Sequence, residues 1–161
     1  MKLTITTYKL LFAAVCALLA ISCQNQSITE IPPGFSLKWQ SGPTHADRGA
    51  HEFIKIAASD NGYILTKGET FRFFSKEDGK LKDKTDIEVE KELPQQLVLK
   101  LCQLIVDEHI LSMNERYRDP DIMDGDYKSL NIEWNGESKT ISAINRTPDE
   151  LKRIFKELSY L

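Results

Sequence analysis

The fold of this chain is decided by residues 52–65, EFIKIAASDNGYIL. Apolar residues recur at every second position on both sides of an Asn-Gly pair at positions 61 and 62, and Asn-Gly is the preferred pair for a two-residue hairpin turn. A turn at these positions places Asp60 opposite Tyr63 and Ala58 opposite Leu65. One face of the predicted hairpin then holds the side chains of Ile54, Ile56, Ala58, Tyr63 and Leu65.

Further strands are predicted on both sides of this hairpin. Residues 35–40 alternate between apolar and polar, and residues 70–75, which contain three phenylalanines, predict a third strand. The charged stretch 76–92 follows, and within it Ile87 and Val89 indicate a short edge strand. Residues 129–134 alternate again and lead through a second Asn-Gly pair, at positions 135 and 136, into a returning strand.

Two helices complete the predicted fold. Pro94 suits the first turn of a helix, and apolar residues from 97 to 106 surround most of its circumference, which indicates burial on more than one side. Residues 147–150, Thr-Pro-Asp-Glu, are typical of a capping box, and apolar residues at helical spacing follow as far as Leu158. The sequence therefore predicts an α+β fold, with a mostly antiparallel sheet built from hairpins and two helices packed on one face.

The first residues have the pattern of a secretory signal peptide. Lys2 and Lys9 precede an apolar run over residues 10–21, which ends at Ser22 and Cys23. Because a membrane-spanning helix needs about 20 apolar residues, the short run favours cleavage over an uncut anchor. We expect residues 1–22 to be a lipoprotein signal peptide, residues 23–34 a tether and residues 35–161 a single domain.

The end of the apolar run resembles the lipobox of bacterial lipoproteins. Ile21, Ser22 and Cys23 fit that motif, whereas Ala20 stands where leucine is commonest. Together with the aromatic first strand, the loop at residues 119–125, and the closing hairpin and helix, this motif makes the chain similar to small uncharacterised lipoproteins of Gram-negative bacteria. Ordinary signal-peptidase cleavage, which would leave a free thiol, is the alternative.

The resemblance implies a covalent lipid and a location. A diacylglycerol thioether on Cys23 and an acylated amino terminus, typically a palmitate, would hold the protein in the cell envelope. Gln24 follows the cysteine in place of aspartate, which resembles sorting to the outer membrane rather than the inner membrane. The family offers no catalytic residues that could be carried over to this chain.

Charge and cysteine content limit the partners and the chemistry. The formal net charge of the chain is −3, and loss of Lys2 and Lys9 would make the remainder more acidic, so nucleic acid is not an expected partner. Once Cys16 is cleaved off and Cys23 is acylated, Cys102 is left without a cysteine to pair with. Because Cys102 lies in the apolar helix, we expect a small buried residue and not a nucleophile.

Two groups of residues raise the hypothesis of a metal site. His45, Asp47 and His51 combine imidazole and carboxylate, the usual ligands of zinc. The sequence from His51 begins like the helical zinc-protease motif, but Lys55 occupies the position of the second histidine, so that motif is excluded. A looser site is one interpretation, and exposed loop residues are the other.

The second group consists of four aspartates in one loop, Asp119, Asp121, Asp124 and Asp126. Carboxylate oxygens suit calcium, but counting from Asp119 the fifth position is Met123 and the glycine comes seventh, so the helix-loop-helix calcium pattern is not matched. An irregular calcium site is one hypothesis. A turn with locally hydrogen-bonded aspartates is the alternative.

Known catalytic motifs are absent from the sequence, which contains no nucleophile elbow and no phosphate-binding glycine loop. We therefore expect a membrane-anchored envelope lipoprotein that acts as a non-catalytic binding or interaction module. Its partner would be an envelope protein or a glycan, and no cofactor besides the covalent lipid is expected. The alternative is a metal-dependent hydrolase or a calcium-dependent binder that uses one of the two candidate metal groups.

Aromatic residues could form either the core or a binding patch for sugars or a protein. The core is favoured, because large apolar side chains are usually buried. The residues concerned are Trp39, Phe53, Tyr63, Phe71, Phe73, Phe74 and Trp134.

Overall fold

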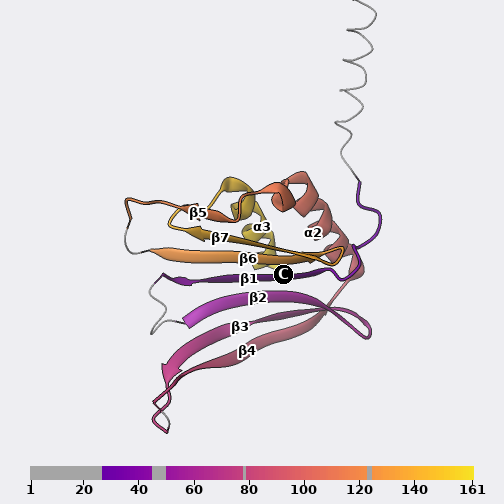
Figure 1. Ribbon diagram of the computed structural model, residues 1–161. Helices are drawn as coiled ribbons and strands as arrows, with labels where there is room; N and C mark the ends of the chain where they lie inside the picture. Colours follow the sequence, from indigo (N-terminus) through magenta and orange to yellow (C-terminus); the bar gives the residue numbers. More distant parts are fainter. Residues whose placement is uncertain (1–26, 45–49, 78, 123–124) are drawn as a thin grey trace, which may run out of the picture.

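The fold is known from a computed structural model, which describes residues 27–44, 50–77, 79–122 and 125–161 (Figure 1). No helix in this part of the chain is both long enough and apolar enough to cross a membrane. The elements follow one another in the order β1 (Ser36–Pro43), β2 (Ala50–Ser59), β3 (Gly62–Phe74), β4 (Leu81–Leu93), α2 (Gln95–Asp107), the 3₁₀ turn η1 (Ile110–Ser112), β5 (Arg116–Arg118), β6 (Asp126–Trp134), β7 (Glu137–Ile144) and α3 (Asp149–Tyr160).

The strands form one mixed sheet, and this corrects the prediction of a sheet built from hairpins, although five of the six strand pairings among the described residues are antiparallel. The strand order is β4-β3-β2-β1-β6-β7-β5, and β5 runs parallel to β7 at one edge. In the middle, β1 pairs with β6, which lies far from it in the sequence. Hairpin patterns could not reveal either pairing, because neither one is made by a local turn.

The hairpin between β2 and β3 has a different register from the predicted one. Ser59 pairs with Gly62 and Ala58 with Tyr63, so the turn consists of Asp60 and Asn61. Neither turn residue has a positive φ, whereas Gly62 has a φ of 136°, which a residue without a side chain tolerates. The register shift is an even number of residues, so the predicted apolar face is preserved.

The strand β3 and its neighbour β4 form a ribbon longer than predicted. The two strands pair from Tyr63 with Leu93 to Phe74 with Leu81, so the third strand is continuous with the hairpin and does not begin at residue 70. Every residue of β4 except Leu93 is exposed. Because β4 buries almost nothing, its charged sequence lacks the apolar alternation that would have predicted its full length.

The core lies between one face of the sheet and the two helices (Figure 1). The prediction that α2 is buried on more than one side is wrong, since its buried residues form one stripe and Leu97 is 38% exposed. The fully buried side chains of the sheet include Leu37, Ile56, Leu65, Leu130, Ile132 and Ile141, and those of the helices include Cys102, Ile105, Leu151, Ile154 and Leu158.

Helix α3 begins one residue later than a capping box would require. Pro148 occupies the N-cap position, and no side chain caps the helix. The predicted capping box of Thr147 is therefore wrong. The apolar stripe of Leu151, Ile154 and Leu158 is confirmed, because all three side chains are buried.

The residues before β1 lie against the domain. The backbone N–H of Ile28 donates a hydrogen bond of 2.6 Å to the side-chain oxygen of Gln103 on α2. Ile28 and Ile31 pack against the core, and the backbone N–H of Phe35 bonds to the carbonyl oxygen of Pro32. These contacts hold the chain from residue 28 onward beside α2.

Candidate functional site

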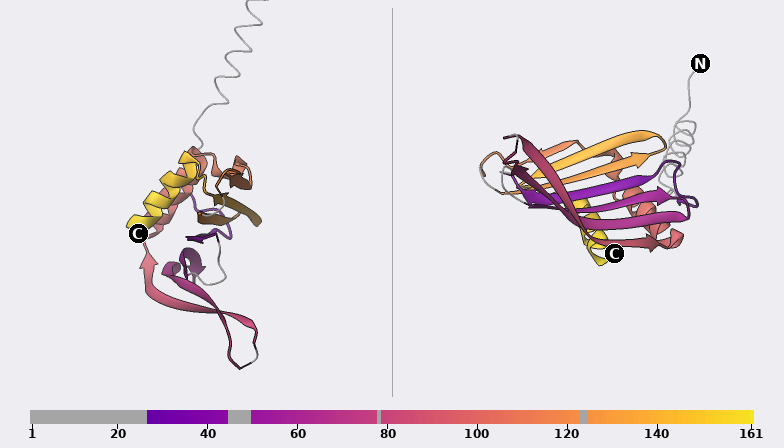
Figure 2. Two further views of the ribbon diagram at one scale, coloured as in Figure 1. Left: turned by 90° about the vertical axis from the view of Figure 1, so that its left-hand side faces the viewer. Right: turned by 90° about the horizontal axis from the view of Figure 1, so that it is seen from below.

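The face of the sheet that carries no helix contains a polar groove. In Figure 2 the helices lie on one side of the sheet, and the tip of the β3–β4 ribbon extends to the other side. The groove has a volume of about 410 Å³. It is lined by side chains from β1, β2, β3, β4 and β6, namely Lys38, Gln40, His51, Thr70, Arg72, Asp83, Thr85 and Tyr127.

Curvature of the sheet brings these residues together. Strands β4 and β6 are separated by three others, which corresponds to about 19 Å in a flat sheet. Thr85 of β4 and Tyr127 of β6 nevertheless line one groove, which requires a strongly curled sheet. A bulge at Glu88, where the register shifts between Lys67 and Gly68, increases the twist of the ribbon.

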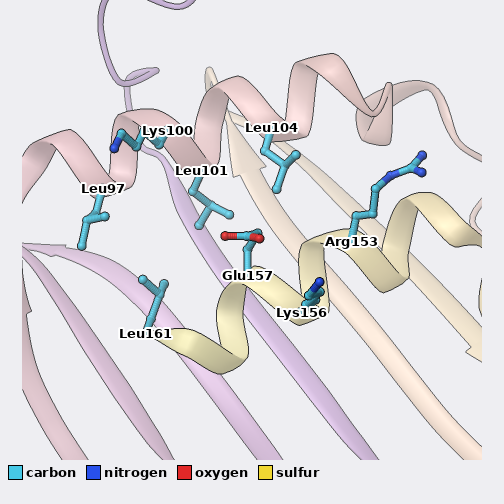
Figure 3. Close-up of a pocket in the computed structure, with 8 residues that line it drawn as sticks. All are labelled: Leu97, Lys100, Leu101, Leu104, Arg153, Lys156, Glu157 and Leu161. Carbon is cyan, nitrogen blue, oxygen red and sulfur yellow. The ribbon is translucent and has the colours of Figure 1, made fainter.

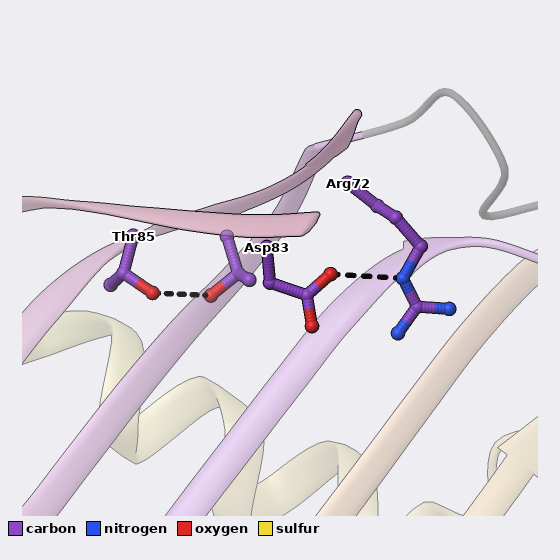
Figure 4. A network of polar contacts seen from close by, with 4 residues as sticks. Arg72, Asp83 and Thr85 are labelled. Carbon is purple, nitrogen blue, oxygen red and sulfur yellow. Dashed lines mark hydrogen bonds and ion pairs between the residues drawn. The ribbon is translucent and has the colours of Figure 1, made fainter. Parts of the chain in front are cut away.

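Two polar contacts form the wall of the groove on the β3–β4 ribbon (Figure 4). The Nε atom of Arg72 donates a hydrogen bond of 3.0 Å to Oδ1 of Asp83. The hydroxyl groups of Thr70 and Thr85 lie 3.5 Å apart. Both contacts join residues that are direct partners in the ladder, so the backbone register positions the side chains.

His51 and Tyr127 line the groove next to each other. The two rings meet edge to face, with centroids 6.2 Å apart. The imidazole lies against Gly42 of β1, where an added Cβ would come within 2.7 Å of Nδ1. A glycine at position 42 therefore leaves the space that the imidazole occupies.

Two lysines lie on the same face, and one of them, Lys38, lines the groove. Lys38 and Lys55 are direct partners across β1 and β2, and both are exposed. The Nζ atom of Lys38 lies 5.8 Å from the centre of the Phe53 ring, which is itself buried. Among the described residues, no carboxylate forms an ion pair with either lysine.

The functional groups that line the groove suit the binding of a polar ligand. It provides hydrogen-bond donors and acceptors together with one aromatic phenol, but no thiol. Cys102 lies in the core, where burial raises the pKa of its thiol to about 12, so it is protonated at neutral pH. The expectation that Cys102 is a buried hydrophobic residue is confirmed.

The first group of predicted metal ligands falls partly outside the described residues. His45 and Asp47 lie in residues 45–49, which the structure does not describe. His51 lies in the groove beside Tyr127. Within the described ranges, no three residues of the types His, Cys, Asp and Glu come close enough together to hold a metal ion.

The aspartate loop contains one local hydrogen bond of the type expected in a turn. Oδ1 of Asp119 accepts a bond of 3.1 Å from the backbone N–H of Asp121. Asp126 begins β6, and Asp124 lies outside the described residues. The calcium hypothesis for this loop stays a prediction.

Aromatic residues divide between the two faces of the sheet. Trp39, Tyr63 and Trp134 pack against the core, as expected. Phe53 is buried on the helix-free face beneath Lys38, and Phe73 is 43% exposed, so the core prediction is wrong for Phe73. The side chain of Phe74 lies outside the described part of the structure.

Most groove residues gave no signal in the sequence. The sequence predicts a role for His51, but as a metal ligand. Polar residues such as Gln40, Thr70 and Thr85 occupy the non-core positions of their strands, where polar side chains are expected in any half-exposed sheet. The one available signal was the pair Thr70 and Thr85, which face each other when β3 pairs with β4. This signal can be recognised only when the register of β4 is known.

A second hollow lies between the helices and is mainly apolar (Figure 3). It has a volume of about 420 Å³ and is lined by Leu97, Leu101 and Leu104 of α2 and by Leu161 after α3. Charged side chains of both signs surround it, and one of them, Arg153, pairs with Glu108. The residues that line this hollow do not favour any one class of ligand.

Comparison with known proteins does not assign the chain to a family. No protein-family model matches the chain, and no curated protein shows a significant sequence match to it. Residues 1–26, with the predicted signal peptide and Cys23, lie outside the described residues. Lipidation and envelope location are therefore proposals based on the sequence.

Proposed function

We propose that the protein is a lipid-anchored binding module of the cell envelope, and that the groove on the helix-free face holds its ligand. The supporting observation is the convergence of side chains from β1, β2, β3, β4 and β6 in one hollow. Burial of the core requires only the opposite face of the sheet. The curvature and the polar wall of the helix-free face are thus additional features, which core burial does not require and which ligand binding would explain.

The anchor in this proposal is the acylated Cys23, produced by removal of residues 1–22. Its support is the basic start, the apolar run over residues 10–21 and the lipobox-like ending. Gln24 favours the outer membrane as the destination. A partner in the envelope, either a protein or a glycan, would then be within reach of the groove.

The role of the groove is tested by capture from native membranes. Tagged full-length protein is crosslinked in its membrane, purified, and compared with the Tyr127→Ala and Tyr160→Ala variants. Tyr160 is a matched control, because it is 72% exposed on α3 and does not line the groove. We expect Tyr127→Ala to remove most of the captured component and Tyr160→Ala to leave it unchanged. Equal capture by both variants would rule out the groove as the binding surface.

A further inference from the structure

We infer that the ligand of the groove is an acidic glycan, a chain of sugar rings that bear carboxylate groups. This inference rests on the proposed function and adds the chemical class of the ligand. Three features of the helix-free face support it: a pair of like charges with no carboxylate partner among the described residues, a wall with both donors and acceptors, and main-chain groups that are paired within the sheet in every lining strand except the edge strand β4.

The like charges are Lys38 and Lys55. Like charges directly opposite each other in neighbouring strands destabilise a sheet, and these two lysines are direct partners on one face. The residues next to them in the same row, Asn131 on β6 and Thr66 on β3, are uncharged. An anionic group bound between the two ammonium groups would relieve the repulsion and form charge-assisted hydrogen bonds.

The wall of the groove suits a ligand with many hydroxyl groups. A sugar hydroxyl both donates and accepts hydrogen bonds, and the groove offers partners of both kinds. Asp83 accepts, Gln40 does both through its amide, and the hydroxyls of Thr70 and Thr85 do both. The ring of Tyr127 adds a flat apolar surface on which the C–H groups of a sugar ring can lie.

The backbone of the inner strands of this face offers no free groups to an extended peptide. A peptide that binds to a sheet usually adds a strand to a free edge and gains main-chain hydrogen bonds. Strands β1, β2, β3 and β6 each have a neighbour on both sides, so their main-chain groups are used within the sheet, whereas β4 is an edge strand. An extended peptide could therefore pair only with the outer edge of β4, and recognition by the other strands of the groove depends on side chains.

The test measures binding of defined probes to the full-length protein in detergent solution. The probes are a linear oligogalacturonate, the same oligomer with its carboxyl groups methyl-esterified, and a polyglutamate peptide of similar charge. We expect the oligogalacturonate to bind, more weakly as salt increases. The esterified oligomer should bind at least about tenfold more weakly because it cannot form charge-assisted hydrogen bonds, and polyglutamate should do so because it lacks the hydroxyl groups and rings that the wall and Tyr127 would contact.

Variants locate the interaction. Lys38→Gln/Lys55→Gln is expected to lower the affinity for the oligogalacturonate at least about tenfold, and Lys38→Arg/Lys55→Arg, which keeps both charges, to restore most of it. Lys100→Gln/Lys156→Gln is the control, because it removes two charges from the rim of the hollow between the helices. An equal loss in the control and the groove variant would show an effect of net charge and overturn the assignment.

Each probe also has an outcome that overturns the inference. Equal binding of the esterified oligomer would show that the carboxylates are not recognised, and equal binding of polyglutamate would replace the glycan by an acidic peptide. If no glycan binds while Tyr127→Ala still abolishes capture from membranes, the ligand class is wrong and the proposed function stands. If Tyr127→Ala has no effect on capture, the proposed function fails instead.

Discussion

Arg72 and Asp83 face each other across β3 and β4, with Nε of the guanidinium 3.0 Å from Oδ1 of the carboxylate. Their side chains are 45% and 53% exposed. An ion pair that is this exposed typically contributes at most about 1 kcal/mol to folding. Its position in the wall of the groove makes ligand binding, and not stability, the property that a substitution should change.

The variant Asp83→Ala is therefore expected to lower the free energy of unfolding by less than about 1 kcal/mol and to reduce capture of the envelope component. Urea unfolding and the crosslinking assay measure the two effects. Asp149→Ala is the control, since Asp149 forms a comparably exposed pair with Lys152 on α3. A loss of capture in both variants would contradict a specific role for the groove.

Gly42→Ala is expected to displace the imidazole of His51, because the new Cβ would lie 2.7 Å from Nδ1. Because His51 is half-buried and lines an open groove, its side chain can rotate, and the cost should lie near the lower end of the range for overpacking, about 1 kcal/mol. In a His51→Ala background the clash is removed, so the cost of Gly42→Ala should largely disappear. A double-mutant cycle measured by urea unfolding tests this coupling, and additive costs would show that the two residues do not interact.

Cys102 is expected to resist alkylation in the folded protein. Its peptide should remain unlabelled by iodoacetamide at pH 8 and become labelled in urea, because the thiol is buried and its pKa is raised to about 12. Peptide mass analysis distinguishes it from the other cysteines. Labelling of Cys102 at the same rate with and without urea would contradict the burial.

The same pKa shift predicts a pH dependence of stability. Well below pH 9.0, the ordinary pKa of the thiol, the thiol is protonated in both the folded and the unfolded chain, so its contribution is fully present. As pH rises from there towards 12, the unfolded chain releases the proton first, and stability falls. The decline should be steeper in the wild type than in Cys102→Ala, and equal slopes in urea unfolding would argue against the shift.

The two Asn-Gly pairs are expected to respond differently to substitution. Asn135 has a φ of 54°, in the left-handed region, whereas Asn61 does not have a positive φ. Asn135→Ala should cost about 1 kcal/mol, because alanine lacks the local hydrogen bonds that let asparagine adopt this conformation. Asn61→Ala should cost less than about 0.5 kcal/mol. Equal shifts in the urea midpoint would contradict the difference between the turns.

Replacement of Cys23 by serine is expected to move the protein from the membrane fraction to the soluble fraction or to stall its processing. The reason is that the thioether lipid requires the cysteine sulfur. Cys16→Ser, a change within the predicted signal peptide, is the control and should leave both properties unchanged. Membrane fractionation with intact-mass analysis of the N-terminus measures the effect, and an unchanged Cys23→Ser variant would refute lipidation at this residue.

Elements with strong local patterns could be predicted from the sequence. The apolar face of Ile54, Ile56 and Leu65 is the core face, and the turn at Asn135 and Gly136 joins β6 to β7 as predicted. Strand β4 was predicted only in part. Its exposed residues carry no burial pattern, and it is a strand only because β3 pairs with it along its length.

By itself, the sequence determined the core-facing residues of β1, β2, β6, β7 and α3, because alternation and helical spacing are local properties of the chain. It also determined the signal-peptide pattern before Cys23. The tertiary structure alone decided that β1 lies between β2 and β6, that β5 is parallel to β7, and that Tyr127 and Thr85 share one groove. The physical reason is that strand neighbours and sheet curvature arise from pairing between distant segments, which no local pattern encodes.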